Sequence, residues 1–131
     1  EGIKTQENTR VLQWLSPVNP QHKHRIFRED YQEGTCLWVF DLPEYKAWAT
    51  EENTALFIYG IPGAGKTTLA SLIIDTLLVQ KPAGFAFFYC RHDDQATHVG
   101  ANVLGSLMVQ LAMQHPSAFS DFLEFYKLYH P

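Results

Sequence analysis

The stretch that decides the predicted fold is residues 60–67, with the sequence Gly60-Ile61-Pro62-Gly63-Ala64-Gly65-Lys66-Thr67. The pattern G-x-x-x-x-G-K-T is typical of a loop that holds phosphate groups between a strand and a helix. Glycines allow backbone conformations that are closed to other residues, and they bring consecutive N–H groups close to phosphate oxygens. The alternative is a glycine-rich turn without a ligand. The neighbouring segments favour the first interpretation.

Both flanks of the loop have the pattern that such a site requires. Residues 55–59 (ALFIY) form an unbroken apolar run, as expected of a strand buried on both faces of a parallel sheet. Beyond the loop, apolar residues recur at helical spacing and predict a helix: Leu69, Leu72, Ile73 and Leu77. In this setting Lys66 would contact the β- and γ-phosphates, and the Thr67 hydroxyl would bind Mg²⁺.

A second apolar run, residues 85–90 (FAFFYC), predicts a second strand after a turn at residues 80–84. The predicted fold class is therefore α/β, with a P-loop NTPase strand–loop–helix–strand core, a partial parallel sheet and short N-terminal helices before it. We divide the chain into an N-terminal helical segment, residues 1–53, and the P-loop core, residues 54–131. Other helices are expected to end at residue 15, to span residues 42–49 and 119–129, and to run from a cap at Thr97 to just before Pro116.

The composition is that of one globular domain that works in a reducing compartment. The chain has 131 residues, of which 46% are hydrophobic and 14% aromatic. A net charge of −4 offers no basic surplus for nucleic acid. No apolar stretch approaches the roughly 20 residues of a membrane span, and no signal-peptide pattern is present. The two cysteines form no disulfide framework, so we expect a cytoplasmic protein.

An acidic residue that would organise Mg²⁺ at the end of a second strand is missing from its expected position. Asp93 and Asp94 follow residues 85–90, but a polar linker separates them from the apolar run. We interpret them as an acidic loop rather than as the Walker B acid, and we assign no catalytic residue. A transition-metal cluster is a further interpretation, although its spacing fits no common zinc pattern; it would comprise Cys90, His92, Asp93, Asp94 and His98.

Several motifs between residues 11 and 114 accompany the loop. They are Trp14-Leu15-Ser16-Pro17, Gly34-Thr35 with Trp38, Glu44-Tyr45 with Trp48, Phe87-Phe88-Tyr89-Cys90, and Leu104-Gly105-Ser106-Leu107 with Gln110-Leu111. With these motifs the chain resembles the NACHT-type signal-transducing P-loop NTPases (the STAND class) common in fungi. Their N-terminal part is also called the nephrocystin-3-like N-terminal domain.

The resemblance implies an ATP- or GTP-dependent switch that oligomerises in its triphosphate form and acts in signal transduction and fungal innate immunity. Carried over by position, the nucleotide phosphate site comprises Gly60, Gly63, Ala64, Gly65, Lys66, Thr67 and Thr68, with Mg²⁺ on Thr67. Gly34 and Thr35 match the family segment that approaches the nucleotide base. Cys36 departs from the family, which usually has glycine at this position.

Three functions are compatible with these features. The first function is nucleoside triphosphate binding by the front half of such a switch, in a fragment or a truncated product. Because the Walker B strand and the later sensor residues of the family are absent, hydrolysis is expected to be weak or absent. The alternative is a non-catalytic interaction module with a vestigial loop, which associates with itself or with a full-length relative. A small-molecule kinase would need lid arginines, and Arg91 is the only arginine after the loop. No base-reading motif separates ATP from GTP.

Overall fold

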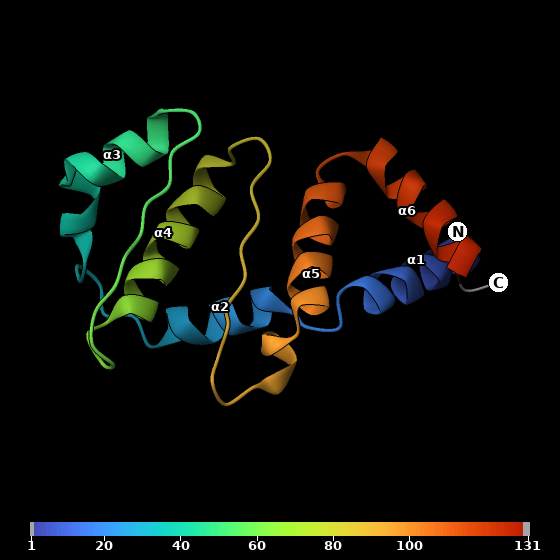
Figure 1. Ribbon diagram of the computed structural model, residues 1–131, viewed down its shortest axis with the longest axis horizontal. Coiled ribbons are helices and arrows are strands. Elements are labelled where there is room, and N and C mark those ends of the chain that lie inside the picture. The colour runs from blue at the N-terminus through green and yellow to red at the C-terminus, as the bar shows by residue number, and fades with distance from the viewer. Residues whose placement is uncertain (1, 130–131) are drawn as a thin grey trace. The chain divides into compact units, whose positions relative to one another are not determined.

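The computed structural model of the chain describes residues 2–129, apart from the side chains of residues 2–5 and of residue 116. The described residues form two compact units, one of residues 2–23 and 81–129 and the other of residues 24–80. The predicted boundary at residue 53 stays a prediction. Along the chain the elements are α1 (Gly2–Leu15), α2 (Pro20–Glu29), the 3₁₀ helix η1 (Leu37–Asp41), α3 (Pro43–Thr50), α4 (Lys66–Gln80), the 3₁₀ helix η2 (Gln95–His98), α5 (Gly100–Met113) and α6 (Pro116–Tyr129) (Figure 1).

The predicted α/β fold with a partial parallel sheet is wrong, because no strand is present among residues 2–129. Both predicted strands, residues 55–59 and 85–90, run as non-helical chain (Figure 1). A strand requires a ladder of backbone hydrogen bonds to a neighbour, and no such ladder joins residues 55–59 to another part of the described chain. Burial on two faces is also absent there, since Phe57 and Tyr59 are each 83% exposed.

Residues 85–87 find their backbone partners on α5 instead of on a strand. The Gln110 amide accepts from the Phe87 N–H at 3.0 Å and donates to the Phe87 carbonyl at 2.7 Å. Gln114 makes the same pair of contacts with Phe85, at 3.2 and 2.6 Å. Four helical residues rise about 6 Å and two extended residues about 6.6 Å, so the spacings of donors and acceptors match. Side-chain amides therefore replace a β-ladder along this edge.

The core of the unit formed by residues 24–80 surrounds α4. Val39 of η1 and Tyr45 of α3 pack against Leu69 and Ile73 of α4, with Cys36, Phe40, Trp48, Leu56 and Leu77 half-buried around them. The predicted helix after residue 42 is confirmed as α3, and Pro43 lies in its first turn, where a missing N–H does no harm. This cluster fixes the N-terminal half of α4, directly after the glycine loop.

In the other unit, α1, α5 and α6 pack together through small and aromatic residues. The Trp14 ring lies 5.9 Å from the Phe125 ring and 5.3 Å from the Tyr126 ring, between centroids. α5 approaches α1 so closely that a β-carbon on Gly105 would lie 1.8 Å from the Leu15 carbonyl oxygen. Glycine is therefore required at this crossing. The predicted helices ending at residue 15 and spanning residues 119–129 are confirmed as α1 and as part of α6.

We predict that Gln110→Leu lowers the free energy of unfolding by about 1–3 kcal/mol, because it removes two partly buried hydrogen bonds to Phe87. Gln114→Leu is the matched control, because it removes the corresponding pair of hydrogen bonds to Phe85 at an exposed site. Water replaces these bonds, so we expect a smaller loss of unfolding free energy. Urea unfolding followed by circular dichroism measures both. Equal losses in the two variants would contradict the role given to Gln110.

Candidate phosphate-binding site

The glycine loop turns between residues 55–59 and α4 by means of two glycines in the left-handed region. Gly63 has a φ of +82° and Gly65 a φ of +94°. A side chain at either position would strain the backbone, because L-residues with a β-carbon rarely adopt these angles. The Ala64 N–H donates to the Ile61 carbonyl at 3.1 Å and closes the turn between them. The glycine pattern in the sequence thus has a local conformational cause.

Lys66 is the first residue of α4, and its side chain folds back over the loop. Its Nζ donates to the carbonyl of Gly60 at 2.5 Å and to that of Ile61 at 2.8 Å. These bonds hold a positive charge among the loop residues, at the positive end of the α4 dipole. An anion at this position would meet both the ammonium group and the helix N-terminus.

The first turn of α4 supplies the remaining predicted groups. The Leu69 N–H donates to the Gly65 carbonyl at 2.9 Å, so the amides of Lys66, Thr67 and Thr68 precede this first closed helical turn. Thr67 is exposed, and Thr68 is half-buried. The structure therefore brings Gly60, Gly63, Ala64, Gly65, Lys66, Thr67 and Thr68 together in one segment, with donors and a hydroxyl of the kind that phosphate and Mg²⁺ require.

Gly34 and Thr35 lie in a turn between α2 and η1, within the same unit. Gly34 has a φ of +89°, and the Thr35 N–H donates to the Gln32 carbonyl at 3.1 Å. Cys36 also has a positive φ, of +64°, which is unfavourable for a residue with a β-carbon. Glycine would adopt this left-handed backbone without strain.

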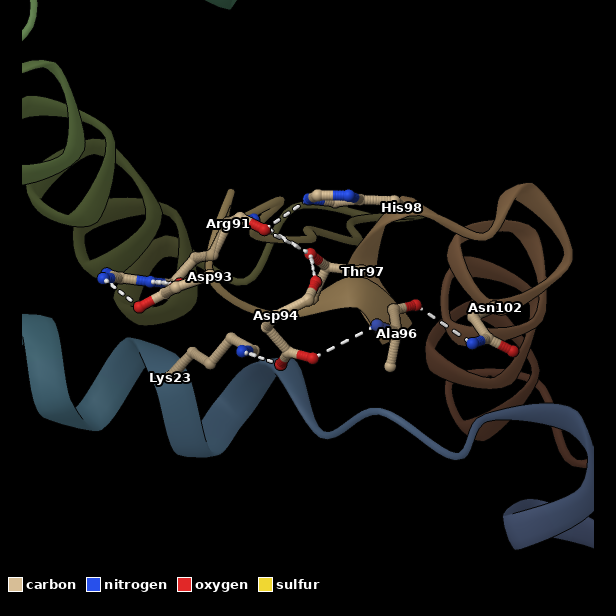
Figure 2. Close-up of polar contacts among 8 residues, drawn as sticks. All are labelled: Lys23, Arg91, Asp93, Asp94, Ala96, Thr97, His98 and Asn102. Carbon is tan, nitrogen blue, oxygen red and sulfur yellow. Dashed lines mark hydrogen bonds and ion pairs between the residues drawn. The ribbon is translucent and has the colours of Figure 1, made fainter.

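Asp93 and Asp94 each form an ion pair (Figure 2). Asp94 Oδ2 lies 2.5 Å from Lys23 Nζ, and Asp94 Oδ1 accepts from the Ala96 N–H at 3.2 Å, which caps η2. Asp93 pairs with Arg91, with Oδ1 3.0 Å from Nε. The hydrogen bond from Lys23 lowers the pKa of Asp94, and that from Arg91 lowers the pKa of Asp93. Both carboxylates are thus fixed as anions within the unit that contains residues 81–129.

Thr97 closes this acidic loop instead of capping α5, so its predicted role as a helix cap is wrong. Its hydroxyl accepts from the Arg91 N–H at 2.9 Å and lies 2.7 Å from the Asp94 carbonyl (Figure 2). Val99 occupies the N-cap position of α5 and makes no side-chain cap. Thr97 is buried, with 1% of its surface exposed, and it therefore holds the loop of residues 91–97 closed.

For the alternative of a transition-metal site, the described residues contain no group of three or more His, Cys, Asp or Glu side chains that would hold a metal ion. Within the loop, the predicted ligands make other contacts: His98 Nε2 bonds the Arg91 carbonyl, while Asp93 and Asp94 form the ion pairs above.

A polar cluster between α2 and α4 was not predicted from the sequence. His24 Nε2 lies 3.5 Å from Asp75 Oδ1, and Arg28 Nη2 lies 3.6 Å from Asp75 Oδ2. The cluster has a sequence signal: His24 and Arg28 are four residues apart on α2, as are Ser71 and Asp75 on α4. Burial lowers the pKa of His24, which is only 7% exposed, although the nearby carboxylate of Asp75 acts in the opposite direction.

Comparison with known proteins shows the family of the chain. Residues 34–130 match the family described as Nephrocystin 3, N-terminal. The chain belongs to this family. Over 111 residues it is also 34% identical to the vegetative incompatibility protein HET-E-1 of Podospora anserina, a match that covers 81% of this chain. The chain spans 8% of the length of that relative. The family match confirms the resemblance found in the sequence, and it includes the loop, α4 and the Gly34–Thr35 turn.

No solved structure matches the chain. Within residues 2–129, none of the helices combines the length and the apolar character that crossing a membrane requires.

We predict that the free energy of unfolding falls as pH is lowered from about 7 to about 5. Because the folded-state pKa of His24 lies below its ordinary value of 6.5, the unfolded chain binds the proton more readily, and protonation favours unfolding. His24→Gln removes this contribution and makes the slope of unfolding free energy against pH shallower. His22→Gln, at an exposed position of the same helix, is the control. A slope that is unchanged in His24→Gln would contradict the prediction.

Proposed function

We propose that the chain binds the phosphates of a nucleoside triphosphate, ATP or GTP, at the glycine loop and the first turn of α4. The observation that carries the proposal is the position of Lys66, whose ammonium group lies within a loop shaped by Gly63 and Gly65. Membership of the nephrocystin 3, N-terminal family supports the same function. The site forms from a continuous segment, so it does not depend on a sheet.

Mg²⁺ would accompany the nucleotide and neutralise charge on the β- and γ-phosphates. The exposed Thr67 hydroxyl, in the first turn of α4, is the group that would bind it. Asp93 and Asp94 are held in ion pairs with Arg91 and Lys23, so neither is assigned to the metal. Without such an acid, water activation lacks its usual residue, and we propose weak or absent hydrolysis by this chain.

Gly34 and Thr35 are proposed to contact the base side of the nucleotide. The turn that contains them lies next to Cys36, which packs on the cluster that includes Leu69 of α4.

We further propose that the chain is the nucleotide-binding part of a cytoplasmic signalling protein. The name of its relative HET-E-1, a vegetative incompatibility protein, supports a role in vegetative incompatibility.

An interaction module is the second candidate, and one observation favours it. Phe57 and Tyr59 are each 83% exposed and Ile61 is 77% exposed, next to the glycine loop. Contiguous exposed apolar side chains mark surfaces that bind other proteins. A second copy of the chain or a full-length relative is the proposed partner, and such association would not need Lys66.

We predict that Lys66→Ala weakens ATP and GTP binding at least tenfold, because a hydrogen bond to a charged group contributes about 1.5–3 kcal/mol. Isothermal titration calorimetry with and without Mg²⁺ measures the affinity. Lys46→Ala is the matched control, since it removes the same charge from an exposed position of α3 in the same unit. Thr67→Ala is expected to bind ATP as before without Mg²⁺ and to lose the increase that Mg²⁺ gives.

Equal affinities in Lys66→Ala and Lys46→Ala would contradict the phosphate site. If the folded wild-type chain binds neither nucleotide, the interaction module becomes the better description. Association that survives Lys66→Ala, measured by analytical ultracentrifugation, would support that second candidate.

A further inference from the structure

Arg28, near the end of α2, contacts α4 and the segment that follows α2 at the same time. Its Nη2 lies 3.6 Å from Asp75 Oδ2, and its Nη1 lies 3.5 Å from the hydroxyl of Ser71. Its guanidinium carbon lies 4.0 Å from the centroid of the Tyr31 ring, a cation–π distance. Arg28 therefore connects α4 with Tyr31.

The contact on α4 reaches the first turn of that helix. Ser71 is fully buried, and its hydroxyl donates to the Thr68 carbonyl at 2.8 Å. Thr68 belongs to the proposed phosphate site. Arg28 thus contacts Ser71, whose hydroxyl is hydrogen-bonded to Thr68 in the first turn of α4.

Tyr31 extends the connection to the turn that carries Gly34 and Thr35. Its hydroxyl donates to the Thr35 carbonyl at 2.7 Å. The Thr35 N–H and hydroxyl both donate to the Gln32 carbonyl and close the turn. The Tyr31 hydroxyl adds a further hydrogen bond to this turn. Cys36 then packs on the cluster that contains Leu69. The turn is therefore held to α4 on two sides.

We propose that Tyr31 and Arg28 are positioning residues, which fix the Gly34–Thr35 turn relative to the N-terminal half of α4. This inference rests on the proposed function. The ligand would be a nucleoside triphosphate with its phosphates at Lys66 and its base side against the turn. Holding the turn in place before binding removes the ordering penalty that a flexible turn would impose. The effect concerns only ligands that carry a base.

Tyr31→Phe tests the proposal, because it keeps the ring beneath Arg28 and removes only the hydroxyl bond to Thr35. Affinities for ATP and for inorganic tripolyphosphate, both with Mg²⁺, are measured by calorimetry. We expect ATP to bind about fivefold more weakly, the size of one lost hydrogen bond, and tripolyphosphate to bind as before. Tyr59→Phe is the matched control, since its ring is 83% exposed next to the loop, and both affinities should stay unchanged.

Arg28→Lys provides a second variant that keeps a positive charge opposite Asp75 but loses the planar group over Tyr31. It is expected to weaken ATP binding and to leave tripolyphosphate binding unchanged, with a thermal melt confirming that the variant is folded. Equal weakening of both ligands, or of neither, in Tyr31→Phe and Arg28→Lys would overturn the inference and leave the phosphate site intact. If wild-type binding of tripolyphosphate is absent or does not depend on Lys66, the proposed function fails, and the inference fails with it.

Discussion

The two hydrogen bonds from Lys66 to the carbonyls of Gly60 and Ile61 are the interaction on which the site depends. They provide hydrogen-bond donors for two carbonyls of the loop, and they hold the positive charge of Lys66 at the N-terminus of α4. Gly63 and Gly65 supply the left-handed conformations that allow the chain to reverse so tightly. All of these features lie within one short segment, so the loop keeps its form without a sheet on either side.

α4 transmits the constraint to the rest of its unit. Leu69 and Ile73 pack on Val39 and Tyr45 on one side, while Ser71 and Asp75 contact Arg28 elsewhere on the helix. Apolar packing thus stabilises the unit, and the polar cluster determines how α2 and the following turn contact α4. These two kinds of contact connect the turn that contains Gly34 and Thr35 to α4, through Tyr31 and Arg28 and through Cys36.

The sequence predicts the features of this molecule that depend on neighbours along the chain. Spacing and residue type predict the helix after the glycine loop, the helix near residues 42–49 and the helix that ends at residue 15. A strand depends on a partner far along the chain, and for that reason residues 55–59 and 85–90 were predicted wrongly. The partners of residues 85–87 are the amides of Gln110 and Gln114, and apolar patterning contains no information about them.

The link from Arg28 through Tyr31 to Thr35 also escaped prediction. The spacing of four residues on α2 and on α4 marks the polar cluster, but it does not show that the two helices meet or that Tyr31 reaches Thr35. Asp93 illustrates the reverse case, since the separation from the apolar run already indicated a local role, and its ion pair with Arg91 agrees with it. The partner of Asp94 is Lys23, which lies far away in the sequence. Polar contacts between segments that lie far apart in the sequence are therefore found only in the structure.

Hydrogen–deuterium exchange at the amides of residues 63–68 tests the central claim most directly, namely that the loop and the first turn of α4 hold phosphate. With Mg²⁺ present, ATP and inorganic tripolyphosphate are predicted to slow exchange at these amides, because phosphate oxygens accept hydrogen bonds from them. Adenosine, which lacks phosphate, is predicted to leave them unchanged. Unaltered exchange at residues 63–68 in a folded chain with saturating ATP would contradict the account.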